Sequence, residues 1–333
     1  MFDSSISAPK FPTRYNDRKE VIWFNSEPIK LESLTGKVVL IDFWTYSCIN
    51  CQRTLPYLKK WWDKYQDSGL VIIGVHTPEF EFEKDPENIK EALRKYKVDW
   101  PVVIDNDYQV WELYANHYWP AKYLIDHKGK IIFHHAGEGN YIETEMKIQS
   151  ALEEAGFKIS KQLVSDISRE SGALWKAQTP ETYLGYARGV LGNSGGIREE
   201  KSFEYHFHDE VTEPDAVYLE GAWKVDKEYL QHARETEDLE DLLILSYKSK
   251  DVYLVMESED KKMIKVYVTL DSVGLTQENA GKDIQFDPEG RSFVEVQFAT
   301  LYHLISTESF GDHILRLSTT SDKLRCFAFT FGA

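Results

Sequence analysis

Cysteine is scarce in this chain, with three residues among 333. So few cysteines in so long a chain cannot form the disulfide framework of a small secreted domain. The chain also has no run of about 18 apolar residues that could cross a membrane. Its N-terminus, "MFDSSISAPKF", has neither the basic start nor the apolar segment of a secretory signal. These absences predict a cytoplasmic protein, or an extracytoplasmic one if an upstream segment precedes this sequence.

The chain has few basic residues relative to acidic ones: 39 against 55, which gives a net charge of −16. Most of the excess lies in residues 161–333, which hold 19 basic and 31 acidic residues. An acidic surface excludes nucleic acid and anionic membranes as the default partners. Hydrophobic residues make up 42% of the chain, enough for the cores of two domains of ordinary size.

Residues 1–160 alternate predicted strands and helices. Apolar, β-branched runs predict strands at 37–44, 70–76 and 101–105, and helical spacing predicts helices at 49–67, 85–98 and 107–116. A hairpin over 121–135 and a helix over 141–155 follow, and an N-terminal hairpin of 21–24 and 28–31 precedes. This order predicts an α/β domain with parallel central strands and antiparallel edges.

Residues 201–333 have the alternating hydrophobic pattern of an all-β domain. Short alternating strands are predicted at 216–225, 241–247, 251–257, 262–270, 291–298, 301–306, 313–319 and 324–331. Eight such strands with turn residues between them predict a β-sandwich of the jelly-roll type. Residues 161–200, which include "NSGG", are expected to be a linker and interdomain segment.

Two of the three cysteines lie in "FWTYSCINCQRTLP", residues 43–56. A redox dithiol needs two sulfurs on one side of a helix, and residues three apart at a helix start meet this need. The unpaired N–H groups and the positive dipole end of that helix stabilise a thiolate. The spacing therefore predicts Cys48 as an exposed nucleophile and Cys51, one turn further on, as a buried resolving thiol.

Two more positions fit a working dithiol. Asp42 precedes Cys48 by six residues on the strand that ends at the motif, where it could accept the proton of Cys51. Pro120, in "WPA", directly precedes the predicted hairpin. A cis proline there would bend the chain toward the cysteines and leave backbone groups free for a substrate strand.

Other interpretations of the cysteines explain less. A zinc site needs about four ligands, and the third cysteine, Cys326, lies in a predicted core strand of the other domain. A structural disulfide across so short a loop would add little stability. A thiol-dependent peroxidase is the stronger rival, because Thr45 stands three residues before Cys48 and Cys51 could resolve a sulfenic acid. No metal site is predicted.

These residues resemble the thioredoxin superfamily, in its TlpA/redoxin branch. "FWTYSCINCQRTLPYL", "GVHTPEFEFEKD", "YWPAKYLID" and "TPETYLGYAR" are similar to the soluble C-terminal region of DipZ proteins. There a thioredoxin-like domain precedes a β-sandwich that resembles a carbohydrate-binding module. The resemblance implies Cys48 as attacking thiol and Cys51 as resolving thiol, with the remaining site residues being the buried acid Asp42, the cis proline Pro120, and a substrate groove of Trp44, Trp119 and Glu79.

The resemblance also implies a function. The function implied is a thiol–disulfide oxidoreductase that reduces protein disulfides through a mixed disulfide, or oxidises protein dithiols in the reverse direction. It needs no cofactor beyond the Cys48–Cys51 disulfide, and it needs an electron donor that is thioredoxin reductase-like or a membrane CcdA-like protein. The sandwich would bind carbohydrate. Ile49 and Asn50 replace the Gly-Pro pair of ordinary thioredoxins, which leaves the redox potential open. A ligand-binding module with a redox-sensing dithiol is a further alternative.

Overall fold

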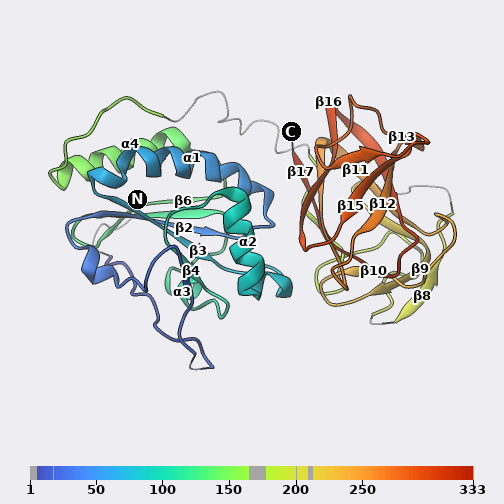
Figure 1. The fold of residues 1–333 in the computed structure, drawn as a ribbon, viewed down its shortest axis with the longest axis horizontal. Helices are drawn as coiled ribbons and strands as arrows, with labels where there is room; N and C mark the ends of the chain where they lie inside the picture. Colours follow the sequence, from blue (N-terminus) through green and yellow to red (C-terminus); the bar gives the residue numbers. More distant parts are fainter. Residues whose placement is uncertain (1–5, 18, 165–177, 200, 209–212, 333) are drawn as a thin grey trace. The chain divides into compact units, whose positions relative to one another are not determined.

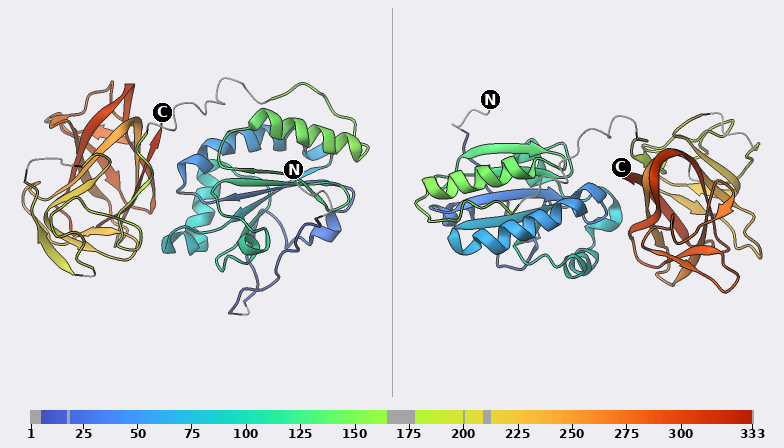
Figure 2. Two further views of the ribbon diagram at one scale, coloured as in Figure 1. Left: turned by 180° about the vertical axis from the view of Figure 1, so that it is seen from behind. Right: turned by 90° about the horizontal axis from the view of Figure 1, so that it is seen from above.

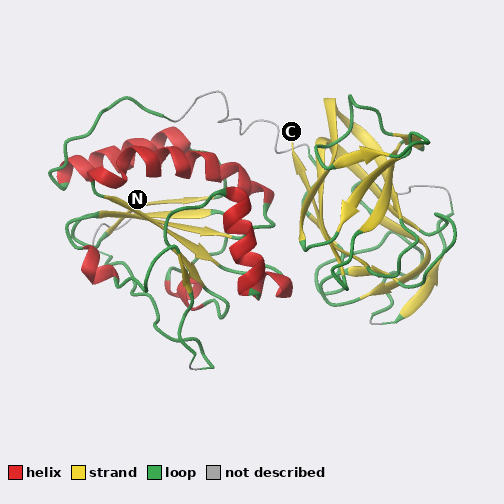
Figure 3. Ribbon diagram, in the orientation of Figure 1, coloured by secondary structure: helices red, strands yellow, loops and turns green. Residues whose placement is uncertain are grey.

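The structure, a computed structural model, describes residues 6–17, 19–164, 178–199, 201–208 and 213–332. The chain forms two compact units, residues 1–172 and 173–333 (Figure 1). The described part of the first unit combines helices and strands, whereas that of the second is built from strands (Figure 3). The α/β and all-β classes predicted from the sequence are confirmed. Within the expected linker, 165–177 lies outside the described residues, and Thr182–Tyr183 pairs with a strand of the second unit.

The first unit contains a six-stranded sheet in the order β1-β4-β3-β2-β5-β6. Strands β2, β3 and β4 are parallel, and β1, β5 and β6 pair in the antiparallel sense. Every residue of β2 is buried, as the apolar run predicts for a central strand covered on both faces. The bounds are β1 (Trp23–Phe24), β2 (Val38–Trp44), β3 (Leu70–His76), β4 (Val102–Ile104), β5 (Ala121–Ile125) and β6 (Ile131–Ala136).

Helices cover both faces of this sheet. Residues of α1 (Ile49–Tyr65), α2 (Pro86–Tyr96) and α4 (Tyr141–Glu154) share one core with the sheet, and α3 (Gln109–Leu113) joins the core on the other face. Figures 1 and 2 show α1 and α4 side by side on their face. Short 3₁₀ helices are η1 (Leu31–Leu34), η2 (Gln66–Ser68) and η3 (Glu81–Lys84). In the part of the chain that the structure describes, no helix is long and apolar enough to cross a membrane.

The predicted N-terminal hairpin is wrong in its pairing. β1 pairs with β4, with Trp23 opposite Val103, and residues 28–31 form no strand. Pro28 lacks the N–H that a strand pair needs, and the chain turns into η1 instead. β1 therefore covers the free edge of β4 rather than forming a separate ribbon.

In the described part of the second unit the named strands pair in the antiparallel sense. Two isolated bridges, Leu191 with Val217 and Glu199 with Val225, are parallel. β11 and β16 each take the place of two predicted strands, because the chain continues across positions where the sequence suggests turns. β11 pairs with β16 on one side, and with β9 and then β17 on the other. The bounds are β7 (Thr182–Tyr183), β8 (Ser202–Tyr205), β9 (Val217–Val225), β10 (Leu230–His232), β11 (Leu242–Ser258), β12 (Ile264–Leu270), β13 (Val273–Gly274), β14 (Ile284–Phe286), β15 (Ser292–Val296), β16 (Thr300–Ser318) and β17 (Leu324–Gly332).

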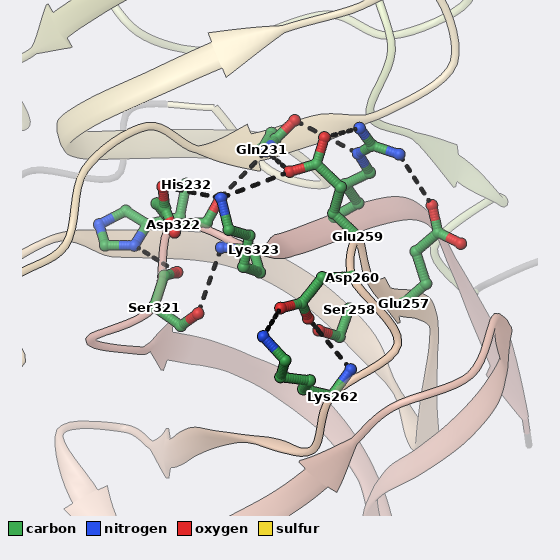
Figure 4. Close-up of polar contacts among 11 residues, drawn as sticks. Gln231, His232, Glu257, Ser258, Glu259, Asp260, Lys262, Ser321, Asp322 and Lys323 are labelled. Carbon is green, nitrogen blue, oxygen red and sulfur yellow. Dashed lines mark hydrogen bonds and ion pairs between the residues drawn. The ribbon is translucent and has the colours of Figure 1, made fainter.

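A polar cluster joins β10, the end of β11 and the start of β17 (Figure 4). Arg325 donates from Nη1 to Oε1 of Glu257 and from Nε to Oε1 of Gln231, each at 3.3 Å. Its Nη2 donates to Oε1 of Glu259. Lys323 Nζ lies 3.7 Å from Oε2 of Glu259. Because these side chains are partly exposed, each ion pair alone contributes little to the free energy of unfolding. Together the pairs link the ends of three strands.

A buried aspartate fixes the middle of β9. Asp241 accepts hydrogen bonds from Arg234 at 2.6 and 2.8 Å, and His232 Nε2 lies 2.8 Å from it. Gly221 faces this carboxylate with a φ of 84°, in the left-handed region that favours glycine. A Cβ atom at Gly221 would overlap Oδ1 of Asp241, so the position has neither the space nor the backbone angle for a side chain.

We expect Gly221→Ala to lower the free energy of unfolding of the second unit by at least about 2 kcal/mol, because a strained φ and a steric overlap add. The urea midpoint for alkylation of the fully buried Cys326 reports this unit's unfolding. Gly274→Ala is the control, since a Cβ there meets no atom within 4 Å, and it should change stability by less than about 0.5 kcal/mol. Equal effects of the two substitutions would contradict the prediction.

Candidate active site

The CxxC pair lies where β2 passes into α1. Cys48 is the N-cap residue of α1, and its Sγ accepts a hydrogen bond from the backbone N–H of Cys51 at 3.2 Å. Cys48 is half-buried, whereas Cys51 is 1% exposed, and the two sulfurs are not joined in a disulfide. A sulfur at this position is next to the positive end of the helix dipole, which favours a thiolate. One thiol is therefore accessible and the other lies behind it.

Cys51 resists ionisation in this state. Burial raises its pKa well above the usual value, and the contact with Cys48 and the negative charge of Asp42 raise it further. A hydrogen bond with the backbone of Thr45 acts in the opposite direction. Cys51 therefore needs a base nearby before it can attack as a thiolate.

Asp42 and Lys122 lie directly opposite each other on β2 and β5. Both side chains are fully buried, with exposures of 1% and 0%. Burial raises the pKa of Asp42 to about 7, and the charge of Lys122 opposes that rise. Burial lowers the pKa of Lys122, and the negative charges of Asp42, Cys51 and Glu138 oppose that fall. A carboxyl with a raised pKa and an amine with a lowered pKa therefore interact with the buried thiol of Cys51.

Glu83, from η3, holds the segment before Cys48. Its Oε1 accepts from the Ser47 hydroxyl at 2.5 Å, and its Oε2 accepts from the backbone N–H groups of Glu79 at 2.5 Å and Phe80 at 3.1 Å. The carboxyl is completely buried, and burial raises its pKa to about 7 against the hydrogen bonds of Ser47 and Thr45. Glu83 therefore connects the turn that carries Cys48 to the segment that follows β3.

His76, at the end of β3, supports the same turn. Its Nε2 lies 3.3 Å from the Thr45 hydroxyl, and its ring stacks on Tyr46 at 5.7 Å between centroids. Burial lowers the pKa of His76 to about 3, so the imidazole is neutral at physiological pH. A neutral ring can pack in the core while it still offers one hydrogen-bonding nitrogen to the threonine.

Of the other residues predicted for the site, Trp119 and Glu79 are half-buried, whereas Pro120 and Trp44 are buried. The Trp119–Pro120 peptide bond is cis, as the sequence predicts. Trp119 is half-buried and donates its indole N–H to the Thr77 carbonyl at 3.0 Å. Its ring contacts that of Trp111 at a tilt of 35°, with 4.2 Å between the centroids. Glu79 is half-buried and its backbone binds Glu83. Trp44 is 1% exposed, so its side chain belongs to the core and cannot line a surface groove.

Sequence reasoning missed Lys122, Glu83 and His76. Lys122 carries the one usable signal, because a lysine inside the strand "AKYLI" is surrounded by residues that are otherwise buried. Glu83 is one of several acids in "PEFEFEKD", and nothing in the pattern separates it from the exposed ones. No group of three or more His, Cys, Asp or Glu side chains that could hold a metal is found among the residues that the structure describes.

Comparisons with known proteins agree with the two units. Residues 8–134 match the model of the AhpC/TSA family, and residues 179–332 match the model of the thioredoxin-like C-terminal domain. The second match begins close to the boundary between the units, after residue 172. Each unit therefore corresponds to a family described separately.

Three relatives cover different parts of the chain. Protein DipZ of Mycobacterium bovis is 40% identical over 238 residues, which are 70% of this chain and 33% of that protein. The thiol-disulfide oxidoreductase YkuV of Bacillus subtilis is 32% identical over 135 residues, 40% of this chain and 90% of that protein. The thiol-disulfide oxidoreductase ResA of Halalkalibacterium halodurans is 32% identical over 111 residues, 33% of this chain and 60% of that protein. The chain spans about a third of the length of DipZ.

We expect Ser47→Ala to lower the free energy of unfolding of the first unit by about 2 kcal/mol, because the buried carboxyl of Glu83 loses a donor. The urea midpoint for alkylation of the buried Cys51 in the reduced protein measures this. Ser33→Ala is the matched control, because the Ser33 hydroxyl also donates one hydrogen bond but is exposed. A loss at Ser47 no larger than that at Ser33 would show that Glu83 does not hold the turn.

Proposed function

The chain belongs to the thioredoxin-like thiol–disulfide oxidoreductases, and from this premise we propose that it exchanges protein disulfides through Cys48 and Cys51. The observation that carries the proposal is the asymmetry of the two thiols. Cys48 is accessible at the start of α1, and Cys51 is buried behind it, next to the carboxyl of Asp42. One sulfur suits attack on an external disulfide and the other suits internal resolution.

The first step forms a mixed disulfide. The Cys48 thiolate attacks one sulfur of the substrate disulfide, a Cys48–substrate bond forms, and the second substrate sulfur leaves as a thiolate that takes a proton from solvent. The helix start stabilises the attacking anion, and Glu83 and His76 hold the turn that presents it.

The second step releases the substrate. Cys51 gives its proton to the Asp42 carboxylate, and the resulting thiolate attacks Sγ of Cys48. The Cys48–Cys51 disulfide forms, and the first substrate sulfur leaves as a thiolate. The substrate has gained two electrons, and an external dithiol must return them before the next cycle. The same steps in reverse would oxidise a substrate dithiol.

We propose protein disulfides as substrates, with Trp119 and Glu79 on the surface that receives them and the buried cis proline Pro120 supporting it. The half-buried Trp119 and Glu79 support this. Trp119 contacts the segment that follows β3, Glu79 belongs to that segment, and Glu83 connects the segment to the turn before Cys48. The donor would be a thioredoxin reductase-like enzyme or a membrane CcdA-like protein, according to the compartment, and the second unit would bind carbohydrate.

Cys48→Ser should lower disulfide exchange more than about a hundredfold, because the attacking sulfur is removed. Cys51→Ser should accumulate a mixed disulfide on Cys48, visible by mass spectrometry without reductant. Cys326→Ser is the control and should leave exchange unchanged, since this thiol is fully buried in the second unit and burial raises its pKa.

Cellular function that persists in Cys48→Ser would favour the ligand-binding alternative, in which the second unit does the work. Consumption of peroxide that outpaces disulfide exchange would favour the thiol-dependent peroxidase. Either result would contradict the proposed function.

We expect the reduction potential of the Cys48–Cys51 pair to lie near about −270 mV, as in a reductant of protein disulfides. Equilibration with a dithiothreitol series and thiol labelling of each point would measure it. A potential near about −120 mV would reverse the proposed direction and make the protein an oxidant of thiols.

A further inference from the structure

A short loop, residues 137–140, connects β6 to α4 next to the cis-proline. The backbone N–H of Gly137 donates to the carbonyl of Pro120 at 2.8 Å. Ala121, the residue after this proline, lies opposite Phe43 near the end of β2. The register therefore places the cis-proline beside the point where β2 leads into the dithiol segment, and the loop is bound directly to it.

The far end of this loop is fixed by packing, and a side chain in its middle meets the dithiol helix. Tyr141, the first residue of α4, stacks on Tyr57 of α1 with 3.5 Å between the ring centroids. Glu138 lies between two glycines whose φ angles of 88° and 90° turn the backbone on both sides of it. Its Oε1 lies 3.7 Å from Nη1 of Arg53 on α1. The loop and the helix that carries both cysteines are therefore joined at this ion pair.

The ion pair is better shielded from water than a surface pair. Side-chain exposure is 29% for Arg53 and 15% for Glu138, against 78% and 60% for Arg94 and Glu91 on α2. Burial raises the pKa of Glu138, and the charge of Arg53, followed by that of Lys122, opposes the rise. Oε2 of Glu138 is buried without a hydrogen-bond partner among the described residues. The carboxylate therefore depends mainly on Arg53 for compensation of its charge.

We propose that Arg53 and Glu138 are positioning residues of the exchange reaction, an ion pair that holds the loop 137–140, and through it the cis-proline, in place beside the dithiol helix. This inference rests on the proposed exchange function. The links run from α1 through the ion pair to the loop, and from the loop through the Gly137–Pro120 hydrogen bond to the segment before β5. A substrate chain that lies between the accessible thiol and the cis-proline therefore meets a surface of fixed width.

The charge of Glu138 decides what happens when Arg53 is lost. A mostly buried carboxylate without its cation is unfavourable, because burial removes its hydration. The loop then moves outward to return the carboxylate to water, and the hydrogen bond to Pro120 breaks. A neutral glutamine at position 138 has no such need, so removal of both charges leaves the loop in place. This reversal distinguishes an electrostatic role of Arg53 from the packing of its side chain.

The direct test is amide hydrogen exchange of Gly137, followed by NMR in the reduced full chain. We expect Arg53→Met to speed this exchange at least about tenfold, because methionine keeps an apolar stem but removes the charge. Adding Glu138→Gln should return the rate to within about threefold of that of the unaltered protein. Arg53→Lys, which keeps the charge, should also change the rate by less than about threefold.

Arg94→Met is the matched control, because it removes an arginine from an exposed ion pair on another helix of the same unit. It should leave the amide exchange of Gly137 unchanged. Equal rates in Arg53→Met and Arg94→Met would overturn the inference, and so would an Arg53→Met rate that Glu138→Gln does not lower. Since this readout needs no turnover, it is decided separately from the proposed function.

Substrate binding provides the second readout. With a cyclic peptide closed by one disulfide, Arg53→Met should raise KM about tenfold and change kcat by less than about twofold, since the surface is displaced but the thiols are not. The reaction of Cys48 with hydroxyethyl disulfide, which is too small to span this surface, should be unchanged. Adding Glu138→Gln should restore KM.

The two readouts together separate the possible failures. Faster exchange of the Gly137 amide with an unchanged KM would mean that the loop does not shape the substrate surface, and would overturn the inference. A lack of reaction between the unaltered protein and the peptide disulfide would instead contradict the proposed function.

Discussion

The connection between β2 and α1 is four residues long, Thr45–Cys48, and it must turn a fully buried parallel strand directly into the first turn of a helix. This constraint places the sulfur of Cys48 at the N-cap and Cys51 one turn deeper. Asp42, near the end of β2, is close enough for its charge to affect the pKa of Cys51. The chemistry of the site is therefore a consequence of how short this connection is.

A short connection has to be held in place, and the first unit uses buried polar groups for this. The Glu83 carboxyl accepts hydrogen bonds from the Ser47 hydroxyl before Cys48 and from two backbone N–H groups after β3. The neutral ring of His76 contacts Thr45. Such groups are unfavourable in a core unless each one is satisfied. They gather around the dithiol, where a fixed turn matters more than the cost of burial.

The second unit follows a different principle, because its long strands β11 and β16 each pair along most of their length. Its polar centre is the buried pair Asp241 and His232, which the partly exposed Arg234 joins and which lies against Gly221 of β9. Its own core and its own matched family make it a separate module. The residues of the candidate active site all belong to the first unit.

Local pattern in the sequence was sufficient for the order of strands and helices from β2 to α4, for the place of Cys48 and Cys51 at a helix start, and for the cis bond at Pro120, because nearby residues define each of these. The partner of β1, the continuity of β11 and the burial of Trp44 depended on contacts between distant segments. Lys122 and Glu83 show the difference most clearly. Each is one charged residue among many in the sequence, and only the packing of β5 against β2 and of η3 against the Cys48 turn removes it from water. Burial changes what an ionisable group can do, and burial is a property of the tertiary structure.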